Sequence, residues 1–327
     1  MKNTASAEAH PNIAFIKYWG NQNQTLRVPA NGSLSMNLDS LSTRTTVTFD
    51  PKLPSDVLTL NKAPTSGGPL SRVSDLLERV RRLAKFDLRA RVTSENNFPT
   101  GSGIASSASA FAALALAASQ AAGLELGEKD LSILARTGSG SAARSIPDGF
   151  VEWQPGNDHL SSYAYSIAPA NHWDLVDLIA MISKEHKATG SSSGHALADS
   201  SPLQATRVAD APRRIAICRR AILDRDFDHF AEIVELDSNI MHSVMQTSTP
   251  ALIYWQPATL AVMQAVHSWR KAGLAVCYTI DAGPNVHVIT MGREYGKVRR
   301  LLEDIPGVDN VLRAGPGGPA RLIDPPF

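Results

Sequence analysis

The chain has 327 residues, a formal net charge of +1 from 32 basic and 31 acidic residues, and 43% hydrophobic residues. This length allows two domains with substantial cores, and the balanced charge gives no reason to expect nucleic acid or an anionic membrane as a partner. Cys218 and Cys277 are far apart and lack metal-ligand spacing, which favours a reducing cytoplasm. The polar residues 1–10 contain no signal-peptide core, and no apolar run reaches the ~18 residues of a membrane span.

The predicted elements begin with strands and continue with helices. The apolar patterns predict strands at 13–18, 33–38, 44–49 and 57–60, a Gly/Pro/Ser-rich loop at 64–69, a helix at 73–84, a strand at 88–93, helices at 106–122 and 128–136, and strands at 150–153 and 175–182. A flexible Ser/Gly loop at 187–194 follows. The remaining predictions are helices at 201–224, 226–244 and 257–272, strands at 275–280 and 286–290, a helix at 294–302 and a strand near Val311.

This order of elements predicts an α+β fold with mixed or antiparallel sheets, packed helices and a central cleft, rather than a doubly wound parallel sheet. The composition changes near residues 170–200. We therefore expect an N-terminal α+β domain over residues 1–185, which binds nucleotide and phosphate, and a C-terminal α+β domain over residues 186–327. The two termini could pair across these domains.

The most informative segment is residues 94–110, which ends in an alanine-rich helix. Two glycines permit a tight turn and three serines add hydroxyl donors: Gly101, Gly103, Ser102, Ser106 and Ser107. The helix would direct its free N–H groups at the loop, which suits a phosphate, although a plain loop before a capped, buried helix explains the same pattern. The lysine of a Walker A motif is absent, and Ser106 replaces the third glycine of the dinucleotide pattern.

Three further segments carry residues suited to catalysis. Lys17 lies in an otherwise apolar strand and needs either a structural ion pair or an anionic ligand. Residues 138–144, which include Arg144, could form an anion cradle or a helix cap with a surface arginine. Asp281 ends a strand, as a catalytic carboxylate or as the start of an Asx turn. Together these groups indicate transfer of a phosphoryl group from a nucleotide to an anionic alcohol.

Five ordered motifs resemble those of the diphosphomevalonate decarboxylases, members of the galactokinase, homoserine kinase, mevalonate kinase and phosphomevalonate kinase superfamily. The motifs are Asn12-Ile-Ala-x-x-Lys-Tyr-Trp-Gly20, Ser94-x-Asn-Asn-Phe-Pro-Thr-x-x-Gly-x-Ala-Ser-Ser107, Gly138-Ser-Gly-Ser-Ala-x-Arg-Ser145, Gly149-Phe-Val-Glu-Trp153 and Asp281-Ala-Gly-Pro-Asn285. Trp173-Asp-Leu and Asp237-Ser-Asn-x-x-His242 fit the family too. The resemblance covers nearly the whole chain and implies the two-domain small-molecule kinase fold. It also implies decarboxylation of a phosphorylated mevalonate with ATP and Mg²⁺ by a cytoplasmic homodimer in isoprenoid biosynthesis.

The resemblance also implies roles for individual residues. Asp281 and Lys17 are expected to assist phosphorylation of the 3-hydroxyl, and Arg144 to hold substrate anions. The other substrate contacts are expected from Tyr18, Ser139, Gly140, Ser141, Ser191, Ser192 and His195. The ATP contacts are expected from Ser94, Asn97, Gly101, Ser102, Gly103, Ser106, Ser107 and Lys187. Ser106 is in addition the expected Mg²⁺ ligand.

Two departures from the family pattern bear on the substrate. Asn21 replaces a lysine, and Ser192, followed by His195, stands where an arginine often lies. Two lost charge-assisted hydrogen bonds, each worth ~1.5–3 kcal/mol, would weaken diphosphate binding by roughly two orders of magnitude. We therefore favour a phosphomevalonate decarboxylase that forms isopentenyl phosphate over a diphosphomevalonate decarboxylase, although Lys187 or His195 could supply a replacement charge. A mevalonate 3-kinase, a non-catalytic ATP-binding protein and a dinucleotide oxidoreductase are the alternatives.

Overall fold

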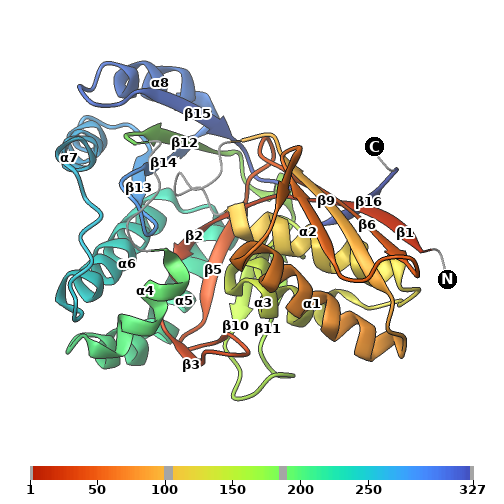
Figure 1. Cartoon of the computed structure of the whole chain (residues 1–327). Coiled ribbons are helices and arrows are strands. Elements are labelled where there is room, and N and C mark those ends of the chain that lie inside the picture. The colour runs from red at the N-terminus through yellow and green to blue at the C-terminus, as the bar shows by residue number, and fades with distance from the viewer. Residues whose placement is uncertain (1–2, 99–105, 184–189, 325–327) are drawn as a thin grey trace.

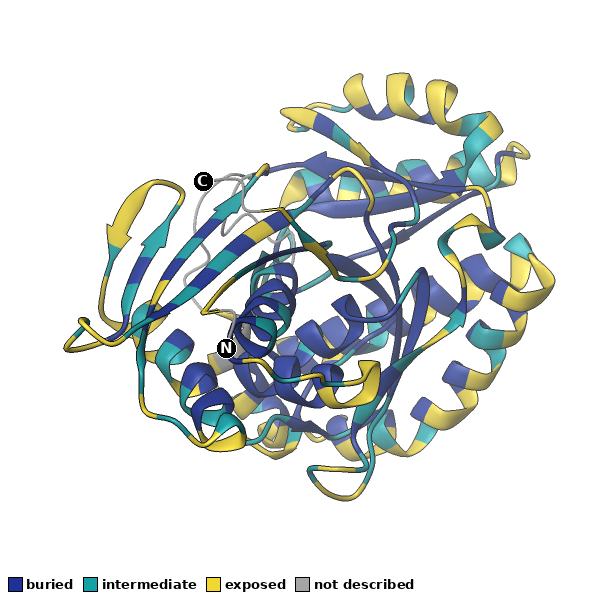
Figure 2. Cartoon of the chain, turned by 90° about the vertical axis from the view of Figure 1, so that its right-hand side faces the viewer, coloured by how far each residue is buried: buried dark blue, intermediate teal, exposed yellow. Residues whose placement is uncertain are grey.

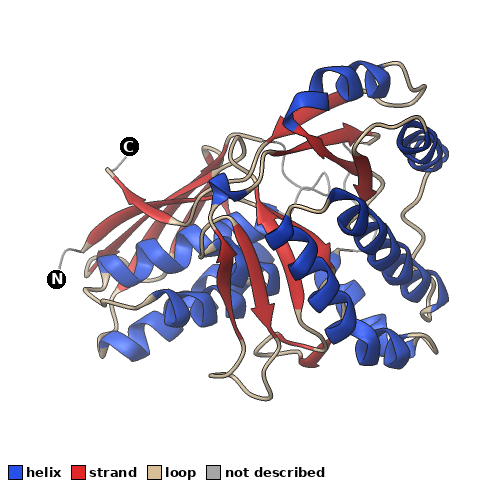
Figure 3. Cartoon of the chain, turned by 180° about the vertical axis from the view of Figure 1, so that it is seen from behind, coloured by secondary structure: helices blue, strands red, loops and turns tan. Residues whose placement is uncertain are grey.

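The computed structural model of the chain describes residues 3–98, 106–183 and 190–324. Within these residues the strands form three larger sheets and one two-stranded ribbon, and helices pack against the sheets (Figures 1 and 3). Strand pairs are antiparallel except for one parallel pair, β7 with β9. The predicted α+β class with mixed and antiparallel sheets is confirmed. No helix in the described part of the chain is long and apolar enough to cross a membrane.

The largest sheet joins the two ends of the chain. Its order is β16-β1-β6-β9-β7-β8, with bounds Arg321–Ile323, Thr4–Ala9, Thr43–Asp50, Arg89–Asn96, Val57–Leu60 and Ala63–Thr65. Buried and less buried residues alternate along β6, as predicted, and the long strands appear striped in Figure 2. The polar sequence of β1 gave no strand pattern. It pairs with β6 and β16, and its buried Glu8 binds Arg44 and Arg321, the residues directly opposite on these flanking strands.

Three helices accompany this sheet: α1 (Gly68–Ala84), α2 (Ser106–Ala121) and α3 (Glu128–Gly138). The alanine-rich α2 packs against β1 and β6 and is almost entirely buried. Small side chains allow this close approach of helix to strand. The loop predicted at 64–69 is partly wrong, because it contains the end of β8 and the start of α1. Hairpin pairing with β7 orders this Pro-containing edge.

The second sheet contains β2, the strand that precedes Lys17. Its order is β11-β10-β5-β2, with bounds Tyr163–Ala168, Phe150–Gln154, Ser33–Asn37 and Asn12–Ile16. Helices α5 (Gln204–Asp224) and α6 (Phe227–Thr247) pack on β2, where the rings of Phe15 and Phe230 meet edge to face at 4.8 Å. A short ribbon of β3 (Asn21–Asn23) and β4 (Val28–Pro29) follows β2.

The third sheet contains β13, the strand that precedes Asp281. Its order is β13-β14-β12-β15, with bounds Val276–Thr279, Val286–Met291, Leu175–Met181 and Asn310–Ala314. It packs with α7 (Pro257–Lys271) and α8 (Tyr295–Glu303). The loop predicted at 187–194 is wrong from Ser191 onward, where α4 (Ser191–Leu197) begins; residues 187–189 lie outside the described residues. Packing of Trp19 against Gly194 accompanies this short helix.

Candidate active site

Two strand ends from different sheets bring Lys17 and Asp281 together. Lys17 follows the last residue of β2, and Asp281 lies two residues beyond the end of β13. The Lys17 Nζ lies 2.6 Å from the Asp281 Oδ1, with side-chain exposures of 1% and 28%. Burial lowers the pKa of Lys17, whereas the neighbouring Asp281 carboxylate opposes this shift. The pair therefore combines a buried cation with a carboxylate that solvent or a ligand can reach.

Arg144 supplies a second buried cation beside this pair. It lies in the 3-10 helix Gly140–Ser145 and is 3% exposed, so the surface-arginine alternative is wrong. Its Nε donates to Asn12 Oδ1 at 3.1 Å, and its Nη1 donates to Ser33 Oγ at 2.6 Å. Burial lowers the pKa of Arg144 to about 10, and Asp281 is the carboxylate that most favours its charged form. Arg144 is therefore cationic at neutral pH and fixed in orientation by two neutral acceptors.

The segment around Gly140 contacts Tyr18 closely. A Cβ at Gly140 would lie 2.6 Å from the Tyr18 hydroxyl oxygen, so only glycine permits this approach. The Tyr18 hydroxyl donates to Asn21 Oδ1 at 2.5 Å. The hydroxyls of Ser139 and Ser107 lie 3.0 Å apart. The structure thus brings the predicted substrate contacts next to a predicted nucleotide contact.

His195 is buried between two aromatic rings. Its ring stacks on Tyr18 at 4.1 Å and packs against Trp19 at 4.6 Å. The Gly20 N–H donates to His195 Nδ1 at 3.0 Å, and burial lowers the pKa of His195 to about 3. The imidazole is therefore neutral. The suggestion that His195 supplies a replacement charge is wrong, because desolvation disfavours the protonated form.

Three arginines that the sequence analysis did not select lie in, or donate to, the segment before Ser139. Arg27 donates to Thr137 O, and Arg72 donates to Gly138 O at 2.9 Å. Arg136 donates to the carbonyl of His159 at 2.9 Å, and its Nε and Nη1 are buried without a hydrogen-bond partner. Burial lowers the pKa of all three guanidiniums. Within residues 3–98, 106–183 and 190–324 none of them forms an ion pair with a carboxylate.

These arginines form the phosphate-side cluster, defined as Arg27, Arg72 and Arg136. Arg136 is fully buried, and Arg27 and Arg72 are partly buried. Cations removed from water without counterions are costly, so this cluster is suited to an anionic ligand. The sequence alone did not reveal it, because its members come from a ribbon, from α1 and from α3. Arg136, directly before the Thr137-Gly-Ser-Gly segment, gave the one usable signal.

Comparison with known proteins identifies the family. The chain matches the model of the diphosphomevalonate decarboxylase-like N-terminal domain over residues 9–164 and that of the mevalonate 5-diphosphate decarboxylase C-terminal domain over residues 177–313. The chain belongs to the diphosphomevalonate decarboxylase family. The predicted family is confirmed.

Individual relatives agree with this assignment. The human diphosphomevalonate decarboxylase is 38% identical, over 86% of this chain and 75% of the relative. The phosphomevalonate decarboxylase of Haloferax volcanii is 35% identical over 98% of both chains. The Staphylococcus aureus mevalonate diphosphate decarboxylase superposes with a TM-score of 0.93 at 36% identity, covering 98% of both chains. A structure described as MDDEF in complex with MVAPP, AMPPCP and magnesium gives 0.92 at 36% identity, covering 98% of this chain and 99% of that chain.

The protein is thus an ATP-dependent carboxy-lyase that acts on a phosphorylated mevalonate. The predicted nucleotide contacts are only partly within the described residues. Ser94 Oγ lies 2.9 Å from Thr45 Oγ1, and the Asn97 amide bonds Ser40 O and Ser42 N at 3.0 and 2.8 Å. Ser106 is the first residue of α2. Gly101, Ser102, Gly103 and Lys187 lie outside the described residues, as do the side chains of Ser191 and Ser192.

Proposed function

We propose that this protein converts 5-phosphomevalonate and ATP to isopentenyl phosphate, ADP, phosphate and carbon dioxide. The observation that carries the choice of the 5-monophosphate is the environment of Asn21. The Asn21 amide accepts from the Tyr18 hydroxyl at 2.5 Å and donates to Gln24 at 2.8 Å, so a neutral, internally bonded group occupies the family's lysine position. The nearby His195 is neutral too. A distal second phosphate would find no cation at either position.

Lys17 and Asp281, which we call the catalytic pair, are suited to phosphorylation of the substrate's tertiary 3-hydroxyl. ATP supplies the phosphoryl group. The Asp281 carboxylate accepts the 3-hydroxyl proton, and Lys17, 2.6 Å from Asp281 Oδ1, offsets the negative charge that develops on the alcohol oxygen. Loss of the 3-phosphate breaks the C–O bond, and the electron pair from the breaking bond to the carboxyl carbon forms the new double bond. Arg144 holds the substrate's carboxylate until carbon dioxide leaves.

The phosphate-side cluster and its neighbours would bind the 5-phosphate. Arg27 and Arg72 donate to the carbonyls of Thr137 and Gly138, and Tyr18 lies against Gly140. Cationic donors beside hydroxyl and backbone groups match the charge of a phosphate dianion. Substrate contacts from Ser141, Ser191 and Ser192 stay predictions.

The start of α2 would bind the nucleotide. The Ser106 and Ser107 side chains are half-buried at the first turn of this helix, where free N–H groups favour phosphate. A serine hydroxyl in this position fits a Mg²⁺ ligand, and a similar solved protein is described with AMPPCP and magnesium. The further ATP contacts, the division at residue 185, the homodimer and the cytoplasmic location stay predictions.

A second candidate is the diphosphomevalonate decarboxylase reaction, which gives isopentenyl diphosphate. It is favoured by the phosphate-side cluster, whose three arginines have enough charge for more than one phosphate. The two reactions differ only in the group that extends beyond the first phosphate.

Substrate comparison tests the choice between them. The wild-type protein should show a higher kcat/KM for the 5-monophosphate than for the 5-diphosphate. Asn21→Lys should shift the ratio toward the 5-diphosphate by about 10-fold, which equals about 1.4 kcal/mol. The matched control Gln22→Lys adds the same charge at an exposed neighbour in β3 and should leave the ratio within about two-fold. A wild type that already prefers the 5-diphosphate by tenfold would contradict the proposal and leave the second candidate.

A further inference from the structure

Two helices hold the backbone beside the catalytic pair. We propose that α5 and α6 are positioning elements: side chains from both helices fix the peptide groups next to Lys17 and before Asp281, and thereby set the separation of the ammonium and the carboxylate. The inference rests on the catalytic role proposed above for that pair. It also gives a role to the Asp237-Ser-Asn-x-x-His242 motif, which the reaction itself leaves unused.

The peptide groups of Lys17 are held from both sides. Lys17 lies beyond the last residue of β2, so its peptide no longer belongs to that strand. Its N–H donates to Asp237 Oδ2 of α6 at 2.6 Å. Its carbonyl accepts from Arg207 Nη2 of α5 at 2.7 Å and from Asn31 Nδ2 at 3.0 Å. At Lys17, hydrogen bonds from side chains therefore take the place of the backbone hydrogen bonds that a strand would form.

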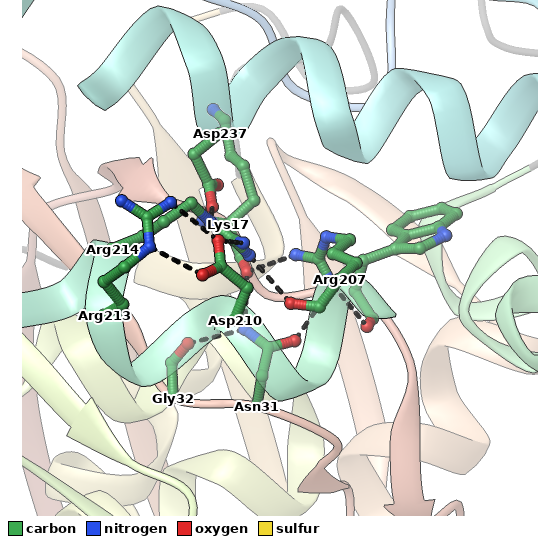
Figure 4. A network of polar contacts seen from close by, with 9 residues as sticks. Lys17, Asn31, Gly32, Arg207, Asp210, Arg213, Arg214 and Asp237 are labelled. Atoms are coloured by element: carbon green, nitrogen blue, oxygen red, sulfur yellow. Dashed lines mark hydrogen bonds and ion pairs between the residues drawn. The ribbon is translucent and has the colours of Figure 1, made fainter. Parts of the chain in front are cut away.

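The groups that hold Lys17 are themselves fixed (Figure 4). Arg214 Nε donates to Asp237 Oδ1 at 2.7 Å, and both side chains are fully buried. Arg214 also donates to Asp210 Oδ2 at 2.7 Å and to the carbonyl of Arg207 at 2.9 Å. Both oxygens of Asp237 are thus engaged. The Arg214–Asp237 pair is therefore held in one orientation, whereas Arg207 Nε has no hydrogen-bond partner among the described residues.

The strand before the catalytic carboxylate is held by the same α6. Ser238 Oγ accepts from Ile280 N at 3.0 Å, and His242 Nε2 donates to Ile280 O at 3.3 Å. One turn earlier, Glu235 Oε1 accepts from Tyr278 N at 3.2 Å. Because β13 is an edge strand of the described sheet, these side chains occupy its free edge.

Adjacent residues of α6 therefore connect to the two catalytic groups. Asp237 accepts from the N–H of Lys17, and Ser238 accepts from the N–H of Ile280, the residue before Asp281. Because a helix keeps neighbouring residues at a constant separation, α6 fixes the position of Lys17 relative to Ile280 and Asp281. Loss of either contact should misplace one partner of the pair, and a displacement of ~1 Å can lower the rate about 100-fold.

The first test changes the contact before the carboxylate. Ser238→Ala removes the acceptor of the Ile280 N–H. We expect kcat, measured by ADP release at saturating substrates, to fall about 10- to 100-fold, with both KM values within about three-fold of wild type. The control Ser243→Ala makes the same change at an exposed site of α6, where the hydroxyl donates to Asn239 O within the helix. It should retain wild-type kcat.

The second test changes the contact at Lys17. Arg207→Lys keeps the charge and removes the planar fork that reaches Lys17 O, Trp19 O and Asn31 Oδ1. We expect at least a 10-fold loss of kcat with little change in KM. Arg220→Lys is the control, because it makes the same substitution on α5 at an exposed arginine that pairs with Asp224, outside this network.

Thermal unfolding and circular dichroism identify which variants fold. One folded variant, Ser238→Ala or Arg207→Lys, is enough to test whether the helices position the pair. Loss of kcat at constant KM in Ser238→Ala or Arg207→Lys, with active controls, supports the inference. Folded variants with kcat within two-fold of wild type, or with the loss confined to KM, would overturn it. A wild type without turnover on any phosphorylated mevalonate would instead contradict the proposed function, so the two failures are distinguishable.

Discussion

The replacement of Asp281 by asparagine tests the proposed catalytic role of the Lys17–Asp281 pair most fully. The amide preserves shape but cannot accept the 3-hydroxyl proton. Loss of a general base lowers rates ~10²- to 10⁴-fold, so kcat should fall at least 100-fold. Phosphorylated mevalonate should still bind within about five-fold of the wild-type Kd, because Arg144 and the phosphate-side cluster are unchanged.

The same variant should also change stability in a pH-dependent way. It leaves Lys17, which is 1% exposed, without its ion-pair partner. Breaking a fully buried pair costs about 3–5 kcal/mol, and the 28% exposure of Asp281 reduces this to about 1–3 kcal/mol. Removing the carboxylate lowers the pKa of Lys17 further, so the unfolded variant binds more protons than the folded one. Its stability should therefore rise between pH 7 and 9 more than that of the wild type.

Three measurements check these expectations. ADP release gives kcat, calorimetric titration gives the Kd of the phosphorylated mevalonate, and urea unfolding at pH 7 and 9 gives the stability difference. Asp224→Asn, at an exposed aspartate of α5, is the control and should behave as wild type. If Asp281→Asn keeps more than a tenth of wild-type kcat, the base role is wrong.

Three further variants probe the surrounding groups. Arg144→Ala should raise KM and lower kcat together, since it removes the cation that binds and orients the substrate's carboxylate. Unchanged kinetics would show that Arg144 has only a structural role. Gly140→Ala should lower kcat/KM at least 10-fold, because its Cβ would lie 2.6 Å from the Tyr18 hydroxyl oxygen, whereas Gly296→Ala, with no atom within 4 Å, should be neutral. Burial lowers the pKa of His195 from 6.5 to about 3, so below pH 6.5 the unfolded chain takes up a proton that the folded protein does not. The free energy of unfolding should therefore fall with pH, by about 2 kcal/mol at pH 5. His195→Asn should therefore lose less stability between pH 7 and 5 than the wild type in urea unfolding, and an equal loss would refute this.

The sequence predicted the long elements well for physical reasons. Helices such as α5 and α6 have apolar faces at helical spacing, and β6 alternates as a half-buried strand does. The strand β1 was missed because its buried positions hold alanine, serine and a glutamate that depends on distant arginines. Such tertiary partners leave no local pattern.

The candidate site was predictable where its charged residues lie in sequence motifs. Lys17 and Asp281 stood out as charges at strand ends, and their 2.6 Å contact joins residues 264 positions apart. Arg27 could not be predicted, because its approach to Thr137 depends on the β3–β4 ribbon lying against α3. The neutrality of His195 depends on burial between rings, which its sequence position does not reveal.

The stoichiometry of a single reaction tests the central claim most directly. Purified protein with Mg²⁺, ATP and 5-phosphomevalonate should release ADP, phosphate and carbon dioxide in equal amounts and form isopentenyl phosphate. ADP release without carbon dioxide, or turnover of the 5-diphosphate alone, would contradict the account.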